Sequence, residues 1–78
     1  MLKSVREKTK ISQSELAKQF GTTQSTIARV ETYQAPLSVD LFDKYRKKFG
    51  MLPVYYYIHC KNYERIRQGL PIIQGIED

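Results

Sequence analysis

A glutamine and an arginine in the segment QSTIARVET are the side chains best suited to chemistry with a ligand. Gln24 and Arg29 lie five positions apart. A glutamine can form two hydrogen bonds with an adenine edge, and an arginine can do the same with a guanine edge. At 3.6 residues per turn, both would share one outward arc of a helix with Ser25, Ala28 and Thr32. The arc is therefore a candidate surface for base contacts, with Gln24, Ser25, Ala28 and Arg29 as the side chains it would present.

This outward arc can stay exposed only if the opposite side of the same helix packs against another helix. Ile27 and Val30 occupy the opposite side and would anchor it to the preceding helix. Ala17 provides a small residue where two helices cross closely, and Gly21 provides the left-handed conformation of a tight turn. Together these residues predict a helix-turn-helix from about Gln13 to Thr32.

Capping signals divide the first fifty residues into four short helices. Ser12 and Glu15 form a capping box, in which the hydroxyl accepts a backbone N–H and the carboxylate reaches back to the cap. Thr23 and Ser38 are the expected N-caps of the third and fourth helices, and Gly50 ends the fourth. Residues at helical spacing predict the inner faces and the joint between the first two helices: Leu2, Val5, Thr9, Ile11, Leu16, Ala17, Phe20, Ile27, Val30, Leu41, Phe42, Tyr45 and Phe49.

The segment after residue 50 has two interpretations. Val54 to Ile58 is rich in strand formers and could alternate as a β-strand. Pro53 instead suits the first turn of a helix. Helical spacing also relates four later residues: Tyr56, Cys60, Tyr63 and Arg67. We expect a fifth helix from about Pro53 to Gln68 in an all-α bundle, with a strand at 54–60 as the alternative.

Positive charge is confined to the first fifty residues. The net charge is +5, with ten Lys/Arg and five Asp/Glu in residues 1–50 and three of each in residues 51–78. Such an excess suits a polyanion, because basic side chains on phosphates release counterions, although it could also serve only solubility. We expect a core at 1–50 and an aromatic extension at 51–78 that packs on it, forms a dimer contact, or both. A basic cluster could bind phosphates or only offset a helix dipole: Lys44, Arg46, Lys47 and Lys48.

Other function classes have little support in the composition. One histidine and one cysteine are too few for the usual metal-binding sets, so His59 and Cys60 are interpreted as ordinary helix residues. No titratable pair is spaced for acid–base work and no glycine-rich phosphate loop is present, so we expect neither an enzyme nor a cofactor. No apolar run approaches the roughly 20 residues of a membrane helix, so we expect a cytoplasmic protein.

The stretch SQSELAKQFGTTQSTIARVE resembles the Cro/CI-type repressor family, also called XRE-like helix-turn-helix proteins. The resemblance covers about Leu2 to Gly50 and implies a compact bundle of the lambda-repressor type, with helices 2 and 3 as the helix-turn-helix. It implies that Gln13 contacts a phosphate and braces the first recognition residue, and that Arg6 and Glu31 form a structural ion pair. An unpartnered carboxylate at the edge of the anchored face would indeed be costly. The expected phosphate contacts are Gln13, Thr23, Thr26, Lys10 and Lys18.

The resemblance implies a sequence-specific transcriptional regulator of double-stranded DNA that binds as a homodimer. Half-sites would then lie about 34 Å apart. The alternative is an antitoxin or co-regulator whose tyrosine-rich C-terminal half and Leu70–Ile76 arm bind a protein partner. One departure concerns the loop after Glu31, where the family usually has a glycine followed by basic residues. Here the loop runs Thr32-Tyr33-Gln34-Ala35-Pro36, so a non-glycine residue must end the helix.

Overall fold

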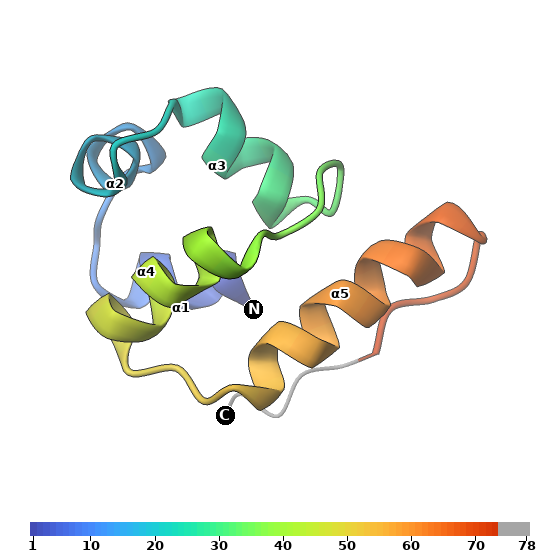
Figure 1. The fold of residues 1–78 in the computed structure, drawn as a ribbon. Helices are drawn as coiled ribbons and strands as arrows, with labels where there is room; N and C mark the ends of the chain where they lie inside the picture. The colour runs from blue at the N-terminus through green and yellow to red at the C-terminus, as the bar shows by residue number, and fades with distance from the viewer. Residues whose placement is uncertain (74–78) are drawn as a thin grey trace.

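The computed structural model describes residues 1–73, which form five helices and no strand (Figure 1). The all-α fold is therefore confirmed, and the strand alternative at 54–60 is wrong because that segment is helical. The part of the expected C-terminal arm beyond Ile73 lies outside the described residues. The helices are α1 (Leu2–Lys8), α2 (Gln13–Phe20), α3 (Gln24–Glu31), α4 (Val39–Phe49) and α5 (Val54–Arg67).

Side-chain caps begin the three middle helices, at the positions expected from the sequence. Ser12, Thr23 and Ser38 each accept a hydrogen bond from the N–H three residues further on, at 3.0–3.2 Å. Gly21 and Gly50 end α2 and α4 in the left-handed conformation, with φ of +69° and +70°. These local signals set the length of each helix before any tertiary contact is made.

Two local expectations are wrong in detail. The carboxylate of Glu15 does not return to the backbone of Ser12 but accepts a hydrogen bond from Gln19 Nε2 at 3.4 Å. Both side chains are exposed, so water can satisfy the backbone N–H instead. Thr9 is also exposed, because α1 ends at Lys8 and the Thr9 hydroxyl donates to the carbonyl of Arg6 at 2.8 Å.

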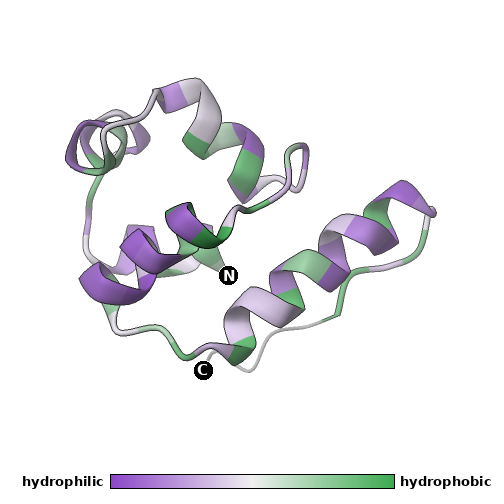
Figure 2. Ribbon diagram, in the orientation of Figure 1, coloured by the Kyte–Doolittle hydropathy of each residue, from purple (hydrophilic) through white to green (hydrophobic). Residues whose placement is uncertain are grey.

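The hydrophobic core lies between α1, α2, α3 and α4, and the hydrophobic part of α3 faces into it (Figure 2). The ring of Tyr45 is fully buried and meets Phe20 edge to face, with centroids 5.0 Å apart. Val5, Ile11 and Phe49, with Leu41, pack at the margin of this core. The buried cluster contains Leu2, Leu16, Ala17, Phe20, Ile27, Val30, Leu37, Phe42, Tyr45 and Met51.

Helix α5 packs on this core through one side only. Tyr56 meets Phe42 with ring centroids 5.3 Å apart, and Ile58 is buried. Asn62 on α5 is 1% exposed, and its amide binds the backbone of Ile73, in the segment that follows α5. Its Oδ1 accepts from the N–H of Ile73 at 2.6 Å, and its Nδ2 donates to the carbonyl of Ile73 at 3.1 Å. Residues 70–73 are thus held along α5 by a two-bond contact with a buried amide (Figure 1).

His59 is the second buried polar side chain of α5. Its ring is 1% exposed, lies 4.7 Å from the ring of Tyr33, and has no hydrogen-bond partner among residues 1–73 on either nitrogen. Burial, with a smaller contribution from the positive N-terminal amine, lowers the pKa of His59 to about 4. In the folded protein the His59 imidazole therefore stays neutral down to a pH well below that at which a histidine of the unfolded chain takes up a proton.

Folding stability should consequently fall as the pH drops from about 6.5 to about 4. Over that window the unfolded chain binds a proton at His59 that the folded chain does not, which reduces the free energy of unfolding by up to about 3 kcal/mol. Urea unfolding at intervals between pH 7 and pH 4 measures this. In the His59→Phe variant, the free energy of unfolding should no longer show this fall with pH, because phenylalanine does not titrate. Phenylalanine can keep the ring contact with Tyr33, and the substitution breaks no hydrogen bond of the histidine side chain within residues 1–73. An identical slope in both proteins would contradict the assignment.

Candidate nucleic-acid interface

The turn between α2 and α3 is short and tightly hydrogen-bonded. The N–H of Gly21 donates to the carbonyl of Lys18 at 3.2 Å, and that of Thr22 donates to the carbonyl of Ala17 at 2.9 Å. Ala17 is 3% exposed, so its methyl group lies inside the bundle. A small side chain there permits the close approach of α3, and the left-handed Gly21 permits the abrupt change of direction.

Helix α3 is anchored on one side and open on the other. Ile27 and Val30 are 0% and 2% exposed and form the anchored side. The opposite side faces outward, and α3 lies at an edge of the bundle (Figure 1). The guanidinium of Arg29 makes no hydrogen bond or ion pair with another residue in 1–73. Along this open side, Gln24, Ser25, Arg29 and Thr32 are exposed and Ala28 is half-buried.

A buried ion pair joins α1 to the end of α3. Arg6 Nε donates to Glu31 Oε2 at 2.6 Å, and Arg6 Nη2 donates to Oε1 at 3.1 Å. The third arm of the guanidinium donates to the carbonyl of Ile11 at 2.8 Å, so Arg6 also fixes the α1–α2 joint. The hydrogen bonds to Glu31 raise the pKa of Arg6, and both residues are less than one-tenth exposed. The pair is bidentate, which restrains its direction as well as its distance.

The ion pair continues toward the open side of α3 through one more residue. Gln13 Nε2 donates to Glu31 Oε1 at 3.0 Å, and Gln13 Oε1 accepts from Gln24 Nε2 at 2.9 Å. A row of side chains thus leads from Arg6 in the core to Gln24 at the surface. A glutamine amide has two donors and one oxygen acceptor, so Gln24 keeps one N–H and its oxygen available for a ligand.

The remaining predicted phosphate contacts lie apart from this row. Thr23 and Thr26 stand together at the N-terminus of α3, with their hydroxyl oxygens 3.0 Å apart. Lys10, in a left-handed conformation with φ of +58°, and Lys18 on α2 are both exposed. Neither lysine pairs with another residue in the described range. The structure therefore groups Gln13 with Gln24 and Thr23 with Thr26, but brings neither lysine to them.

Three cations near the end of α4 already have partners within the chain. Lys44 Nζ donates to the carbonyl of Phe20 at 2.6 Å and so caps the C-terminus of α2. Arg46 and Lys47 pair with Asp43 at 2.6 and 3.1 Å, and they hold the pKa of this carboxyl below its usual value. These contacts favour a structural interpretation of the basic cluster over a phosphate-binding one.

The loop after α3 is held by α5, which the sequence did not reveal. Tyr33 is left-handed with φ of +60°, a costly conformation for a residue with a side chain. Its ring packs on His59, and its hydroxyl lies 3.5 Å from Asn62 Nδ2. Arg67 Nη2 donates to the carbonyl of Gln34 at 3.1 Å. Contacts with α5 therefore accompany a turn for which glycine would be the usual residue.

No metal centre competes with this site in the part of the chain that the structure covers, since no three His, Cys, Asp or Glu residues there are grouped to hold an ion. Among the helices of residues 1–73, none has both the length and the apolar character needed to cross a membrane.

Comparison with known proteins gives one finding. A family model described as helix-turn-helix matches residues 2–56, which span α1 to α4 and the first turn of α5. Neither the curated proteins nor the solved structures include a match to this chain.

The buried ion pair gives a testable consequence for stability. Glu31→Ala leaves the Arg6 guanidinium buried without its partner and should lower the free energy of unfolding by about 3 kcal/mol. The double variant Arg6→Met with Glu31→Leu removes both charges and should be less destabilised than the sum of its single variants. Urea unfolding measures the wild type and each of these variants. As the control, Asp43→Asn removes an exposed ion pair and should leave the unfolding midpoint nearly unchanged; an equal loss there would contradict the interpretation.

Proposed function

We propose a sequence-specific repressor function for this chain, which belongs to the helix-turn-helix family of XRE-type DNA-binding transcription regulators. It would be of phage, plasmid or bacterial type and act on double-stranded DNA in the cytoplasm. The observation that carries the proposal is the open side of α3. That side exposes Gln24, Ser25 and Arg29 while Ile27 and Val30 anchor the helix from behind.

The open side of α3 would read the major groove directly. Arg29, whose guanidinium has no partner in residues 1–73, can donate two hydrogen bonds to a guanine. Gln24 is restrained by Gln13 and still has one donor and one acceptor, which an adenine edge can satisfy. Between them, the Ser25 hydroxyl can bond to a base edge and the Ala28 methyl can contact a thymine methyl.

Phosphate contacts would fix the position of α3 in the groove. Thr23 and Thr26 lie at its N-terminus, where free N–H groups and the helix dipole favour an anion. Gln13, which is hydrogen-bonded to Gln24, would contact a further phosphate, and Lys10 and Lys18 would add electrostatic attraction to the DNA backbone. Such contacts supply affinity, whereas the side chains on the open side supply specificity.

One helix of eight residues reads too few bases to define an operator, so two copies of the chain should bind together. A two-fold pair would place its recognition helices about 34 Å apart, one turn of DNA, and would select a palindromic site. The extension at 51–78 is our candidate for the dimer contact. By occupying an operator, such a pair would block transcription.

Selection from a library of random DNA duplexes tests this function. The recovered sites should share two inverted half-sites with centres 10–11 base pairs apart, or a multiple of that spacing. Recovery of duplexes without a common sequence would show that the chain binds DNA only through its charge. No recovery at all would overturn the proposal.

Substitutions on the open side of α3 should lower affinity for the selected site and relax its sequence. Gln24→Ala and Arg29→Ala should each cost about 1–3 kcal/mol of binding free energy, because each removes bidentate contacts to one base. Titration of the selected duplex and of single-base variants measures both effects. Gln68→Ala, an exposed glutamine beyond α5, is the matched control and should bind as the wild type does. Unchanged affinity in the α3 variants would show that another surface reads the DNA.

Substitution of Lys10 and Lys18 should act differently. Lys10→Ala and Lys18→Ala should weaken binding to every duplex by a similar factor and reduce the salt dependence of log K by about one unit each, because one phosphate contact is lost. Titrations of specific and random duplexes between 50 and 200 mM salt, as a rough range, measure this. Loss confined to the selected site would contradict a phosphate role.

A second candidate function is that of an antitoxin or co-regulator that binds a protein partner. It is favoured by the chain after α5, where Leu70, Ile72 and Ile73 are 37–43% exposed. Purification of the untagged chain together with the product of a neighbouring gene would support it. Both roles can exist in one protein, since these residues lie outside α3.

A further inference from the structure

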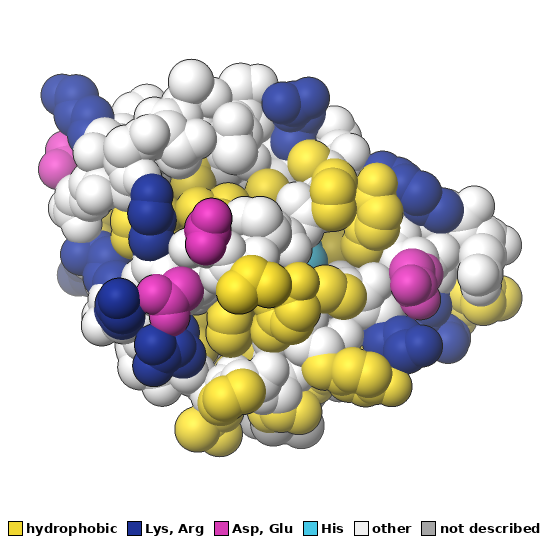
Figure 3. All heavy atoms as spheres, viewed as in Figure 1, with side chains coloured by type: hydrophobic (Ala, Val, Ile, Leu, Met, Phe, Trp, Pro, Cys, Tyr) yellow, Lys and Arg dark blue, Asp and Glu magenta, His cyan; other side chains and the backbone are white. Residues whose placement is uncertain are grey.

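Large apolar side chains are exposed where the N-terminal ends of α4 and α5 meet. Val39 begins α4 and is 66% exposed. Leu52 and Val54 flank Pro53 at the start of α5 and are 58% and 41% exposed, and Tyr57, one turn further, is 60% exposed. In Figure 3, hydrophobic side chains gather over the region between these two helices. Exposed apolar side chains grouped in this way are typical of an interaction site. We call this surface the α4–α5 seam.

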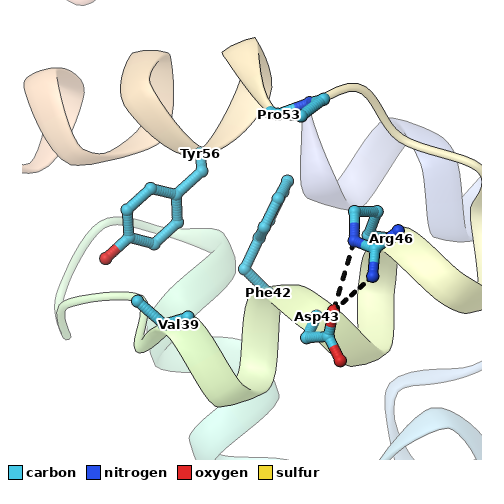
Figure 4. Close-up of a pocket in the computed structure, with 6 residues that line it drawn as sticks. All are labelled: Val39, Phe42, Asp43, Arg46, Pro53 and Tyr56. Atoms are coloured by element: carbon cyan, nitrogen blue, oxygen red, sulfur yellow. Dashed lines mark hydrogen bonds and ion pairs between the residues drawn. The ribbon is translucent and has the colours of Figure 1, made fainter.

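The α4–α5 seam contains a hollow of about 240 Å³. Phe42 points from α4 toward α5, and Tyr56 points from α5 toward Val39 (Figure 4). The contact between these two rings joins the helices across the hollow. The polar side is closed by an ion pair, in which Arg46 donates to Asp43. The residues that line the hollow are Val39, Phe42, Asp43, Arg46, Pro53 and Tyr56.

We propose that the α4–α5 seam is the surface through which two copies of this chain pair about a two-fold axis. Such a contact is made by the same patch of both copies, so the patch must be complementary to itself. The seam meets this requirement because Val39 projects at the rim of the hollow that Phe42 and Tyr56 line. Val39 of each copy then enters the hollow of the other, and both contacts form together.

The charges at the edges of the seam allow two copies to approach. Asp43 is paired with Arg46 and Lys47 on one edge, and Lys61 is paired with Glu64 at 3.8 Å on α5. Each edge therefore carries both signs, so no large block of like charge faces its copy. A mixed polar rim around an apolar centre is the usual composition of a protein interface.

The position of the seam is compatible with DNA binding. Its residues belong to α4, α5 and their connection, whereas α3 lies on the far side of α4 from that connection (Figure 1). Pairing through the seam leaves Gln24 and Arg29 uncovered. Recognition helices about 34 Å apart lie roughly 17 Å from the two-fold axis, a distance that a protomer of 32 × 25 × 21 Å can span. This inference rests on the proposed function, which requires two copies of the chain on one operator. The contact itself can be tested without DNA.

Sedimentation equilibrium of the full chain without DNA tests the seam. The wild type should associate to a dimer and no further. Val39→Asp should raise the dimer dissociation constant on the order of 100-fold, because one substitution places a carboxylate in two equivalent apolar contacts. Asp is well tolerated in the first turn of a helix, so α4 should still form. Ile66→Asp, a 42% exposed residue near the other end of α5, is the matched control and should associate as the wild type does.

A second measurement keeps the test decisive if Val39→Asp fails to fold. Dilution of the wild type should shift the backbone amide NMR signals of Val39, Val54 and Tyr57, and leave those of Gln24 and Arg29 unchanged. A wild type that stays monomeric, a Val39→Asp variant that dimerises normally, or an Ile66→Asp variant that dissociates equally would overturn the proposal. So would a monomer that pairs only with a different protein through the seam.

Binding to a single half-site duplex separates this inference from the proposed function. Val39→Asp should bind the half-site as tightly as the wild type but lose the tighter binding to the full two-fold site. If no protein binds either duplex while the seam variants dissociate as expected, the proposed function fails and the dimer contact stands. If half-site binding is intact and association is unaltered by Val39→Asp, only the dimer contact fails.

Discussion

The bidentate ion pair between Arg6 and Glu31 is the contact on which the geometry of α3 depends. It lies at less than one-tenth exposure, where a lone charge would be costly, so the two helices that carry it must meet at one distance and in one orientation. Through Gln13 the same carboxylate restrains Gln24, a side chain that would otherwise sample many rotamers in solvent. Stability of the core and orientation of a candidate base-reading side chain are therefore set by one row of hydrogen bonds.

The far end of α3 is held in a different way. Tyr33 takes the left-handed conformation that glycine adopts more easily, and α5 contacts this loop through His59, Asn62 and Arg67. The hydrogen bond from the N–H of Gln34 to the carbonyl of Arg29, at 2.8 Å, joins the loop to the last turn of α3. The aromatic extension is thus mechanically connected to the recognition helix. A dimer or partner contact on α5 would act on the same rigid unit, which gives the two halves of the chain a physical reason to occur together.

Local signals explain why so much of the helical core was predictable. Ser12, Thr23 and Ser38 cap helices through bonds to residues three positions away, and Gly21 and Gly50 end them by their own backbone conformation. Buried residues inside the helices follow the 3.6-residue period, which the sequence displays. Two core residues have no such signal, because Leu37 and Met51 lie between helices and are buried only by what packs around them. The choice between helix and strand for α5 was also open locally, since its run of tyrosines and β-branched residues suits both.

By itself, then, the sequence determined the first four helical segments, the closed turn between α2 and α3, and the side of α3 that stays polar, because each depends on residues within a few positions of one another. Apart from the Arg6–Glu31 pair, which the family resemblance implied, tertiary structure alone decided which polar groups meet across long stretches of chain. Lys44 reaches Phe20, Asn62 binds the backbone at Ile73, and His59 is buried against Tyr33. These contacts join residues 11 to 26 positions apart, and no period or cap encodes such a separation. They arise only when the packed helices bring the groups together.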